Sequence, residues 1–387
     1  GNGTGAGIGH DIWSLSSPHY GGNIMEKDST IAGSSQSMPF YYSNSAGVAS
    51  QTDRTFAMPQ DWTVNGLQTL SIAFRGTPGN TGTLYIKINN TKIVYDLSAT
   101  DIALSAWQAW NIDLTAVTGN LYNVTTLSIG VDGAGASGMV LIDDIRLYAQ
   151  PGEMITPEAP DSAGLLAQYT FEGNANDSSG NGLHGTLAGS QIVSPGASGQ
   201  GSAVEMTPGT YVDLGNPTSM DFGTGDWTVT AWFKTGMTGT GDANKGTIVG
   251  KGGDSSGGHR VALIMSETTE GVVTLVCDDN ATKILTHSAA PTNDDQWHFV
   301  AGQRLGTEIR IFIDGQLEAT ETANSTYDLS GTSQHNAYVG AITDNSSMTR
   351  YKMLNGSVDE VALYNRALSA GEILWLAGRT TPFHKPF

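Results

Sequence analysis

Two short segments of the chain place pairs of acidic residues inside apolar stretches. Residues 142–148 read IDDIRLY and residues 358–364 read VDEVALY. Because side chains alternate along a strand, Asp143 and Asp359 are each expected on the face of the apolar residues that follow. An unpaired carboxylate on such a face is costly. Either calcium, which binds carboxylate and carbonyl oxygens, or the backbone amides of a neighbouring turn must therefore satisfy both acids.

Aromatic side chains near loops and strand ends form a second group of candidates. Exposed rings could stack on sugars, and the residues in such positions are Trp13, Tyr20, Trp62 and Trp107. The other tryptophans lie inside apolar motifs and are predicted to pack in cores: Trp110, Trp227, Trp232, Trp297 and Trp375. The sequence thus nominates four residues for carbohydrate binding.

The elements that must position these residues are short strands. Glycine is abundant, with 50 residues, while charged residues make up only 14%. Apolar runs such as LQTLSIAF (67–74) and DWTVTAWFK (226–234) recur between turn residues, which indicates antiparallel β-sandwiches. We therefore predict an all-β protein with two tandem β-sandwich (jelly-roll) domains.

The domain boundary is marked by AQPGEMITPEAPDSAG (149–164), a proline-rich stretch without periodicity. The predicted organisation is an N-terminal arm and aromatic loop over 1–29, a β-sandwich over 30–150, a linker over 151–164, a second β-sandwich over 165–378 and a tail over 379–387. One short helix is expected near 369–378, because Ser369 and Glu372 form a capping box and Gly378 can end it.

The second domain resembles the laminin-G-like branch of the concanavalin A-like lectin/glucanase jelly rolls. The motifs that carry this resemblance occur in order over 165–378: YTFEGNANDSSGNGLHGTL, YVDLG, DWTVTAWFK, IVGKGG, QWHFVAG, IRIFIDGQL and GSVDEVALYNRALSAGEI. The resemblance implies that the terminal strand, turn and helix pack back on the sandwich.

The first domain is similar to galactose-binding-like carbohydrate-binding modules, through SQSMPFYY, LQTLSIAFRG, WQAWNIDL, VTTLSIGV and IDDIRLY. In both families a structural calcium is often held by an aspartate of the last strand and groups of the first strand. The resemblance therefore implies calcium at Asp143 and at Asp359, with Glu172 of YTFEGN as the partner of Asp359.

Signs of catalysis are scarce. The glucanases of this fold use alternating carboxylates of the Glu-x-Asp-x-Glu kind, and the sequence contains no such triplet. The eight histidines form no His-x-x-x-His pair for zinc. We expect the chain not to be an enzyme.

Charge and hydropathy restrict the partners. The net charge of −19 and the lack of a basic cluster argue against nucleic acid. No apolar run is long enough for a membrane-spanning helix.

The leading interpretation is a secreted or cell-surface, non-catalytic protein that binds polysaccharide or glycoprotein glycans in adhesion. An alternative is a structural subunit of an extracellular fibre or surface layer, in which terminal segments pair with other copies of the chain. A weaker alternative is a polysaccharide-degrading enzyme.

Overall fold

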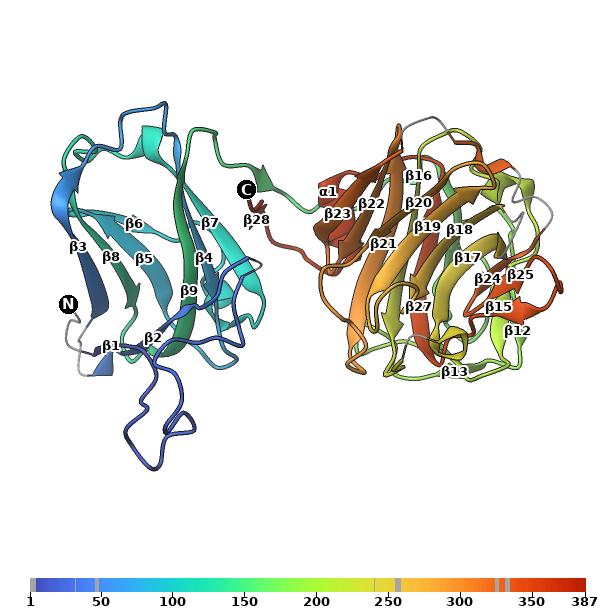
Figure 1. Cartoon of the computed structure of the whole chain (residues 1–387), viewed down its shortest axis with the longest axis horizontal. Coiled ribbons are helices and arrows are strands. Elements are labelled where there is room, and N and C mark those ends of the chain that lie inside the picture. The colour runs from blue at the N-terminus through green and yellow to red at the C-terminus, as the bar shows by residue number, and fades with distance from the viewer. Residues whose placement is uncertain are drawn as a thin grey trace. The chain divides into compact units, whose positions relative to one another are not determined.

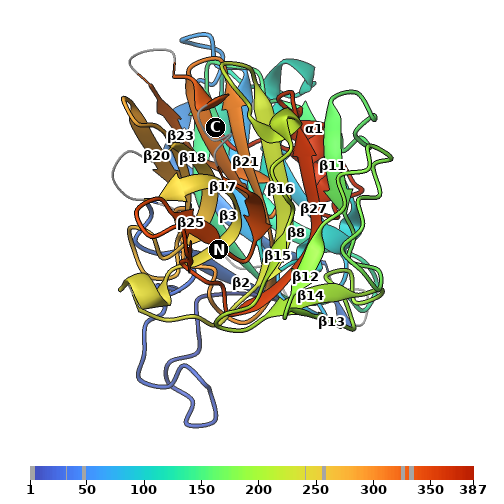
Figure 2. The ribbon, with the colours of Figure 1, turned by 90° about the vertical axis from the view of Figure 1, so that its right-hand side faces the viewer.

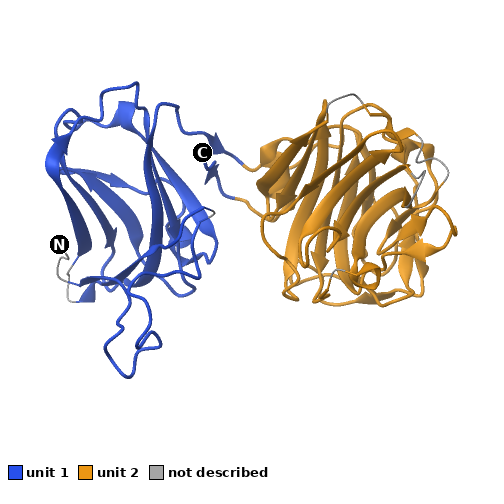
Figure 3. Cartoon of the chain, in the orientation of Figure 1, with its two compact units in different colours: residues 1–156, 381–387 blue, residues 157–380 orange. Residues whose placement is uncertain are grey.

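The computed structural model describes residues 5–31, 33–45, 49–239, 241–254, 259–323, 327–330 and 335–387. The chain forms two compact units (Figures 1 and 3). Unit 1 comprises residues 1–156 and 381–387, and unit 2 comprises residues 157–380. Almost all strand pairs of the described residues are antiparallel, with β17 and β25 as a parallel pair, so the predicted all-β class is confirmed.

Unit 1 is a sandwich of two sheets. Among the described residues, one sheet has the order β1 (Ala6–Ile8), β2 (Met38–Ser43), β9 (Ser137–Tyr148), β4 (Thr69–Arg75), β7 (Trp107–Asp113), β28 (Phe383–His384) and β10 (Met154–Ile155). The other has the order β3 (Ser50–Gln60), β8 (Val124–Asp132), β5 (Thr83–Ile88) and β6 (Thr91–Val94). Phe40, Phe74, Ile86 and Trp110, all nearly inaccessible to solvent, fill the space between the sheets.

Unit 2 is a larger sandwich. Its first sheet runs β13 (Gln191–Val193), β14 (Ala203–Met206), β27 (Gly356–Tyr364), β16 (Trp227–Lys234), β21 (Trp297–Leu305), β22 (Glu308–Ile313) and β23 (Gln316–Thr322), and β11 (Leu165–Tyr169) also pairs with β27. Its second sheet runs β12 (Thr186–Ala188), β15 (Tyr211–Asp213), β24 (Ala337–Val339), β17 (Gly246–Asp254), β18 (His259–Met265), β19 (Val273–Asp279) and β20 (Lys283–His287). Beside β17 lie β25 (Ile342–Asp344) and β26 (Arg350–Tyr351).

The helix α1 (Ala370–Leu376) covers the outer face of the first sheet of unit 2, beside β11 and β27 (Figure 2). Ser369 caps it through the predicted box, because the Glu372 amide donates to the serine hydroxyl and the Ser369 amide donates to the Glu372 carboxylate. Ile373 is fully buried against Phe299 and Tyr364. The expected helix is thus confirmed.

Short 3-10 turns complete the helical structure of the described residues: Ala99–Ala103, Leu114–Ala116, Thr218–Met220 and Asp242–Asn244. No helix of the described residues is both long and apolar enough to cross a membrane.

The two units repeat one strand arrangement. The path β1, β2, β9, β4, β7 in unit 1 corresponds to the path β13, β14, β27, β16, β21 in unit 2. In unit 2 this path continues into β22 and β23, which follow β21 directly in the sequence. In unit 1 it continues into β28 and β10, which stand more than 200 residues apart in the sequence.

Both ends of the described chain are therefore strands of unit 1. Residues Ala6, Gly7 and Ile8 pair with β2, and Phe383 and His384 pair with β10. The predicted linker (151–164) includes β10, and its later part, from residue 157, belongs to unit 2, where Asp161 pairs with Arg366. The fibre alternative depends on the terminal segments, of which Ala6–Ile8 and Phe383–His384 pair within their own chain, while residues 1–4 lie outside the described residues.

Candidate functional site

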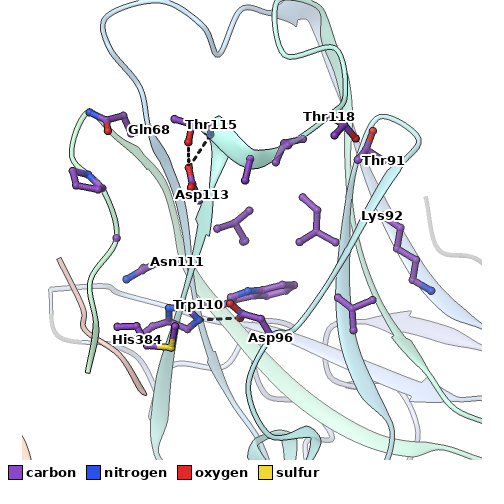
Figure 4. A pocket seen from close by; sticks show the side chains of 18 residues that line it. Gln68, Thr91, Lys92, Asp96, Trp110, Asn111, Asp113, Thr115, Thr118 and His384 are labelled. Atoms are coloured by element: carbon purple, nitrogen blue, oxygen red, sulfur yellow. Dashed lines mark hydrogen bonds and ion pairs between the residues drawn. The ribbon is translucent and has the colours of Figure 1, made fainter. Parts of the chain in front are cut away.

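A cavity of about 520 Å³ opens in unit 1 where β6 faces β7 and β28. Figure 4 shows its polar side chains, which come from both sheets and from the far C-terminus. The polar lining includes Gln68, Asp96, Asn111, Asp113, Thr115 and His384. Its apolar floor includes Ile93, Val94, Ile112, Val117 and Met154. The cavity therefore offers hydrogen-bonding groups around a hydrocarbon surface.

Asp96 is one of two carboxylates in the polar lining of this cavity, with Asp113. Its Oδ1 lies 2.9 Å from His384 Nε2, and this contact joins the segment after β6 to β28. Partial burial raises the pKa of Asp96, but the hydrogen bond and charge of His384, with the indole of Trp110, outweigh it and lower the pKa below the ordinary value. Asp96 is consequently ionised at neutral pH.

Asn111 and Asp113 stand on β7 with fixed orientations. Asn111 Oδ1 accepts a hydrogen bond of 2.8 Å from the Ser71 hydroxyl, and Asn111 Nδ2 donates to the Lys385 carbonyl at 2.7 Å. Asp113 accepts the amide and hydroxyl of Thr115 and thereby caps a 3-10 turn. Contacts within unit 1 therefore fix the orientation of both side chains.

The four predicted aromatic residues do not converge. Trp13 and Tyr20 are exposed by 72% and 55%, and both lie in one loop over 10–28. Trp107 is half-buried at the start of β7. Trp62 is only 6% exposed and packs edge-on against Phe56 in the core of unit 1, so its assignment as an exposed sugar platform is wrong. The sequence places Trp62 in a loop, and a loop position does not reveal that its side chain packs in the core of unit 1.

The loop that carries Trp13 and Tyr20 has a cavity of its own, of about 230 Å³, with His19 and Tyr20 in its lining. His10 anchors the loop, because its ring stacks on His19 at 3.7 Å and its Nδ1 lies 2.8 Å from the Tyr41 hydroxyl. Burial, together with the charge of His19, lowers the pKa of His10 despite Glu26 at 3.3 Å. The loop therefore holds a neutral His10 near pH 7.

Each of the two acidic segments contains a β-bulge. Pairing shifts near Asp144 in β9 and near Glu360 in β27, where these residues have φ of 49° and 48°. The extra residue reverses the side-chain alternation. Val358 and Val361 both pack in the core of unit 2, so Asp359 lies on the opposite face.

The same reversal occurs in unit 1, where Ile142 and Leu147 both contact the core. The expectation that Asp143 and Asp359 share a face with the following apolar residues is wrong for this reason.

Backbone amides satisfy both aspartates. Asp359 accepts the amides of Glu360 at 2.8 Å and of Ala197 at 2.9 Å. Asp143 accepts the amides of Asp144 at 2.8 Å and of Ile31 at 3.3 Å, and the Ser34 hydroxyl at 3.0 Å. Each acid thus caps its bulge and holds an earlier loop of the same unit.

Several oxygen atoms lie close together beside Asp359. A Cβ added to Gly196 would lie 2.7 Å from Asp359 Oδ2 and 2.9 Å from the carbonyl oxygens of Gln200 and Ser202. Glu172 accepts the Ser202 amide at 3.1 Å. Burial raises the pKa of Asp359, its backbone hydrogen bonds lower it, and the charge of Glu172 raises it further. A cation would relieve this repulsion.

The number of acidic ligands is small. In the described part of the chain, no group of three or more His, Cys, Asp and Glu side chains is arranged to hold a metal. Calcium at Glu172 and Asp359 would therefore depend on the carbonyl oxygens. Asp143 already faces three hydrogen-bond donors, which compete with a cation.

Asp96 and His384 were not predicted as site residues from the sequence. They are 288 residues apart, and neither belongs to a motif. The two residues lie close together because β28 pairs with β7. No local sequence pattern predicts this pairing.

Comparison with known structures finds similar β-sandwiches at low identity. One similar structure, 19% identical in sequence to this chain, is domain 4 of AbnA in complex with arabinotriose. AbnA is an extracellular GH43 arabinanase from Geobacillus stearothermophilus. The match covers 56% of this chain and all of that domain at a TM-score of 0.43. The CBM40 of Ruminococcus gnavus IT-sialidase bound to α2,3-sialyllactose is 19% identical, over 46% of this chain and 96% of that one, at a TM-score of 0.38.

The binding domain of Paraclostridial Mosquitocidal Protein 1 is 14% identical. It matches 55% of this chain at a TM-score of 0.43, and the match spans about half (52%) of that domain's own length. No curated protein matches the chain.

A family model matches within unit 2. The matched residues, 206–374, extend from β14 to α1 and include the bulge at Glu360. The matched family is the concanavalin A-like lectin/glucanases superfamily, and the laminin-G-like resemblance of the second domain is confirmed over these residues.

Proposed function

We propose that the chain is a non-catalytic carbohydrate-binding protein that acts outside the cell, and that the cavity of unit 1 is its glycan site. The observation that carries this proposal is the ring of Asp96, Asn111, Gln68 and Asp113 around an apolar floor. Sugars present hydroxyl groups on their rims and C–H groups on their ring faces. A polar ring around hydrocarbon complements both.

The ionisation of Asp96 supports binding rather than hydrolysis. Glycoside hydrolysis requires one carboxylic acid with a raised pKa that protonates the leaving oxygen. In the cavity, His384 lowers the pKa of Asp96, while Asp113 is engaged by Thr115. An ionised Asp96 accepts hydrogen bonds from sugar hydroxyls and donates none.

The test is binding to a panel of neutral oligosaccharides, measured by calorimetry on the whole chain. We expect millimolar to micromolar affinity in wild type and at least about a tenfold loss in Asp96→Ala, which removes a charged acceptor. Glu321→Ala, an exposed site on β23, is the matched control and should bind as wild type. Equal affinity in wild type and Asp96→Ala would reject the cavity.

The exposed loop offers a second place for the same function. Trp13→Ala and Tyr20→Ala test it, since both rings are more than half exposed. If these two variants lose affinity while Asp96→Ala keeps it, the loop and not the cavity binds the glycan.

We also propose a structural calcium ion between Glu172 and Asp359. It would link the segment after β11 to β27 and to the loop 194–202, which the carboxylates already hold. Its contribution would be stability of unit 2 rather than chemistry at the glycan.

A further inference from the structure

The C-terminal segment 381–387 (TPFHKPF), called the tail from here on, enters the edge of unit 1 as an added strand. His384 pairs with Ala109 of β7 on one side and with Met154 of β10 on the other. The Lys385 amide donates to the Glu153 carbonyl at 2.9 Å. The tail therefore receives backbone hydrogen bonds as an inserted strand does.

Side chains of the tail meet specific partners as well. Phe383 and His384 are only 5% and 4% exposed. Phe387 stacks on Tyr148 with ring centres 3.9 Å apart, and Lys385 Nζ lies 2.7 Å from Glu153 Oε2. These contacts distinguish the tail from an arbitrary extended peptide.

The tail also forms part of the cavity wall. His384 lines the cavity and hydrogen-bonds Asp96 (Figure 4). The carbonyl of Lys385 orients Asn111. In unit 2 the corresponding strand, β22, continues directly from β21. Residues 1–156 hold no strand in this place among those described, so unit 1 depends on a segment that follows unit 2 in the sequence.

We propose that the edge of unit 1 between β7 and β10 is a strand-binding groove selective for the tail, and that docking of the tail builds the ligand cavity. His384 is the specificity-determining residue of the groove, because its imidazole engages Asp96 at the cavity rim. The occupant is the tail of the same chain. The consequence for ligand binding rests on the proposed carbohydrate function, but tail recognition does not.

The first experiment measures tail recognition without any glycan. A chain truncated after Thr380 is titrated with the synthetic peptide TPFHKPF by calorimetry. We expect one peptide per chain, and about tenfold weaker binding for the peptide with His384→Ala or for a chain with Asp96→Asn. Asp61→Asn is the matched control, since Asp61 is an exposed carboxylate of unit 1 that bonds Thr63, and it should bind the peptide normally. If the truncated chain is folded but does not bind the peptide, the proposal is overturned.

A second measurement uses the whole chain and does not require the truncated form to fold. Hydrogen exchange at the Lys385 amide, which donates to the Glu153 carbonyl, should be slow in wild type and at least about tenfold faster in the His384→Ala variant, because exchange samples the undocked tail. Equal rates in the two chains, or a dimer by light scattering that dissociates when the peptide is added, would overturn docking within one chain.

The glycan panel then separates this proposal from the proposed function. If wild type binds a glycan, the truncated chain should lose that binding and recover it when the peptide is added. If wild type binds none, the carbohydrate function fails, and the peptide titration still decides whether the groove exists. A truncated chain that binds glycan as well as wild type refutes the link between tail and cavity.

Discussion

At the residue scale, burial separates tryptophans that occupy similar places in the sequence. Trp62 is 6% exposed and contacts Phe56, whereas Trp13 is 72% exposed. Trp62→Ala should lower the free energy of unfolding by about 3–5 kcal/mol, since it leaves a cavity in the core of unit 1. Trp13→Ala should lower it by less than about 0.5 kcal/mol. Urea denaturation of both variants measures the difference, and similar losses would contradict the assigned burial.

His298 gives a pH-dependent prediction at the same scale. Its Nδ1 lies 3.0 Å from Asp314 and its Nε2 lies 3.2 Å from Asp294. The hydrogen bond with Asp314 raises the pKa of His298 above 6.5, against the opposite effect of burial. A raised folded-state pKa means that this stabilisation is complete below pH 6.5 and is lost as pH rises through the folded value.

We expect the melting temperature of unit 2 to fall between about pH 6 and about pH 8, with a contribution of the order of 1 kcal/mol from His298. His298→Gln should flatten this part of the profile. An identical pH dependence in the variant and in wild type would show that the pair does not act in this way.

At the element scale, the proposed calcium ion can be tested through the stability of unit 2, because Asp359 lies at the bulge of β27. If calcium joins Glu172 and Asp359, a concentration about a hundredfold above its dissociation constant would stabilise unit 2 by about 2.7 kcal/mol. A chelator should then lower the melting temperature of wild type and leave that of Asp359→Asn unchanged. No shift with a chelator, together with no calcium by elemental analysis, would reject the site.

At the scale of the whole molecule, the acidic net charge restricts which partners the chain is expected to bind. The net charge is −19, from 18 basic and 37 acidic residues. Binding to DNA depends on basic groups that neutralise phosphates and release counterions. We expect no shift of double-stranded DNA in a gel at about 50 mM salt, even with the protein at micromolar concentration. A DNA shift that is lost at higher salt would contradict this prediction and indicate a local basic surface despite the acidic net charge.

The sequence by itself determined the features that depend on near neighbours. Alternating β-branched and aromatic residues predict strands such as β16, and the Ser369–Glu372 box predicts α1, because strand periodicity and capping act within a few residues. Tertiary structure alone decided the rest. One extra residue at Asp144 and at Glu360 reversed the faces of two strands. Insertion of the tail brought His384 to Asp96 across 288 residues, because strand pairing and ring packing between distant segments leave no mark in local sequence.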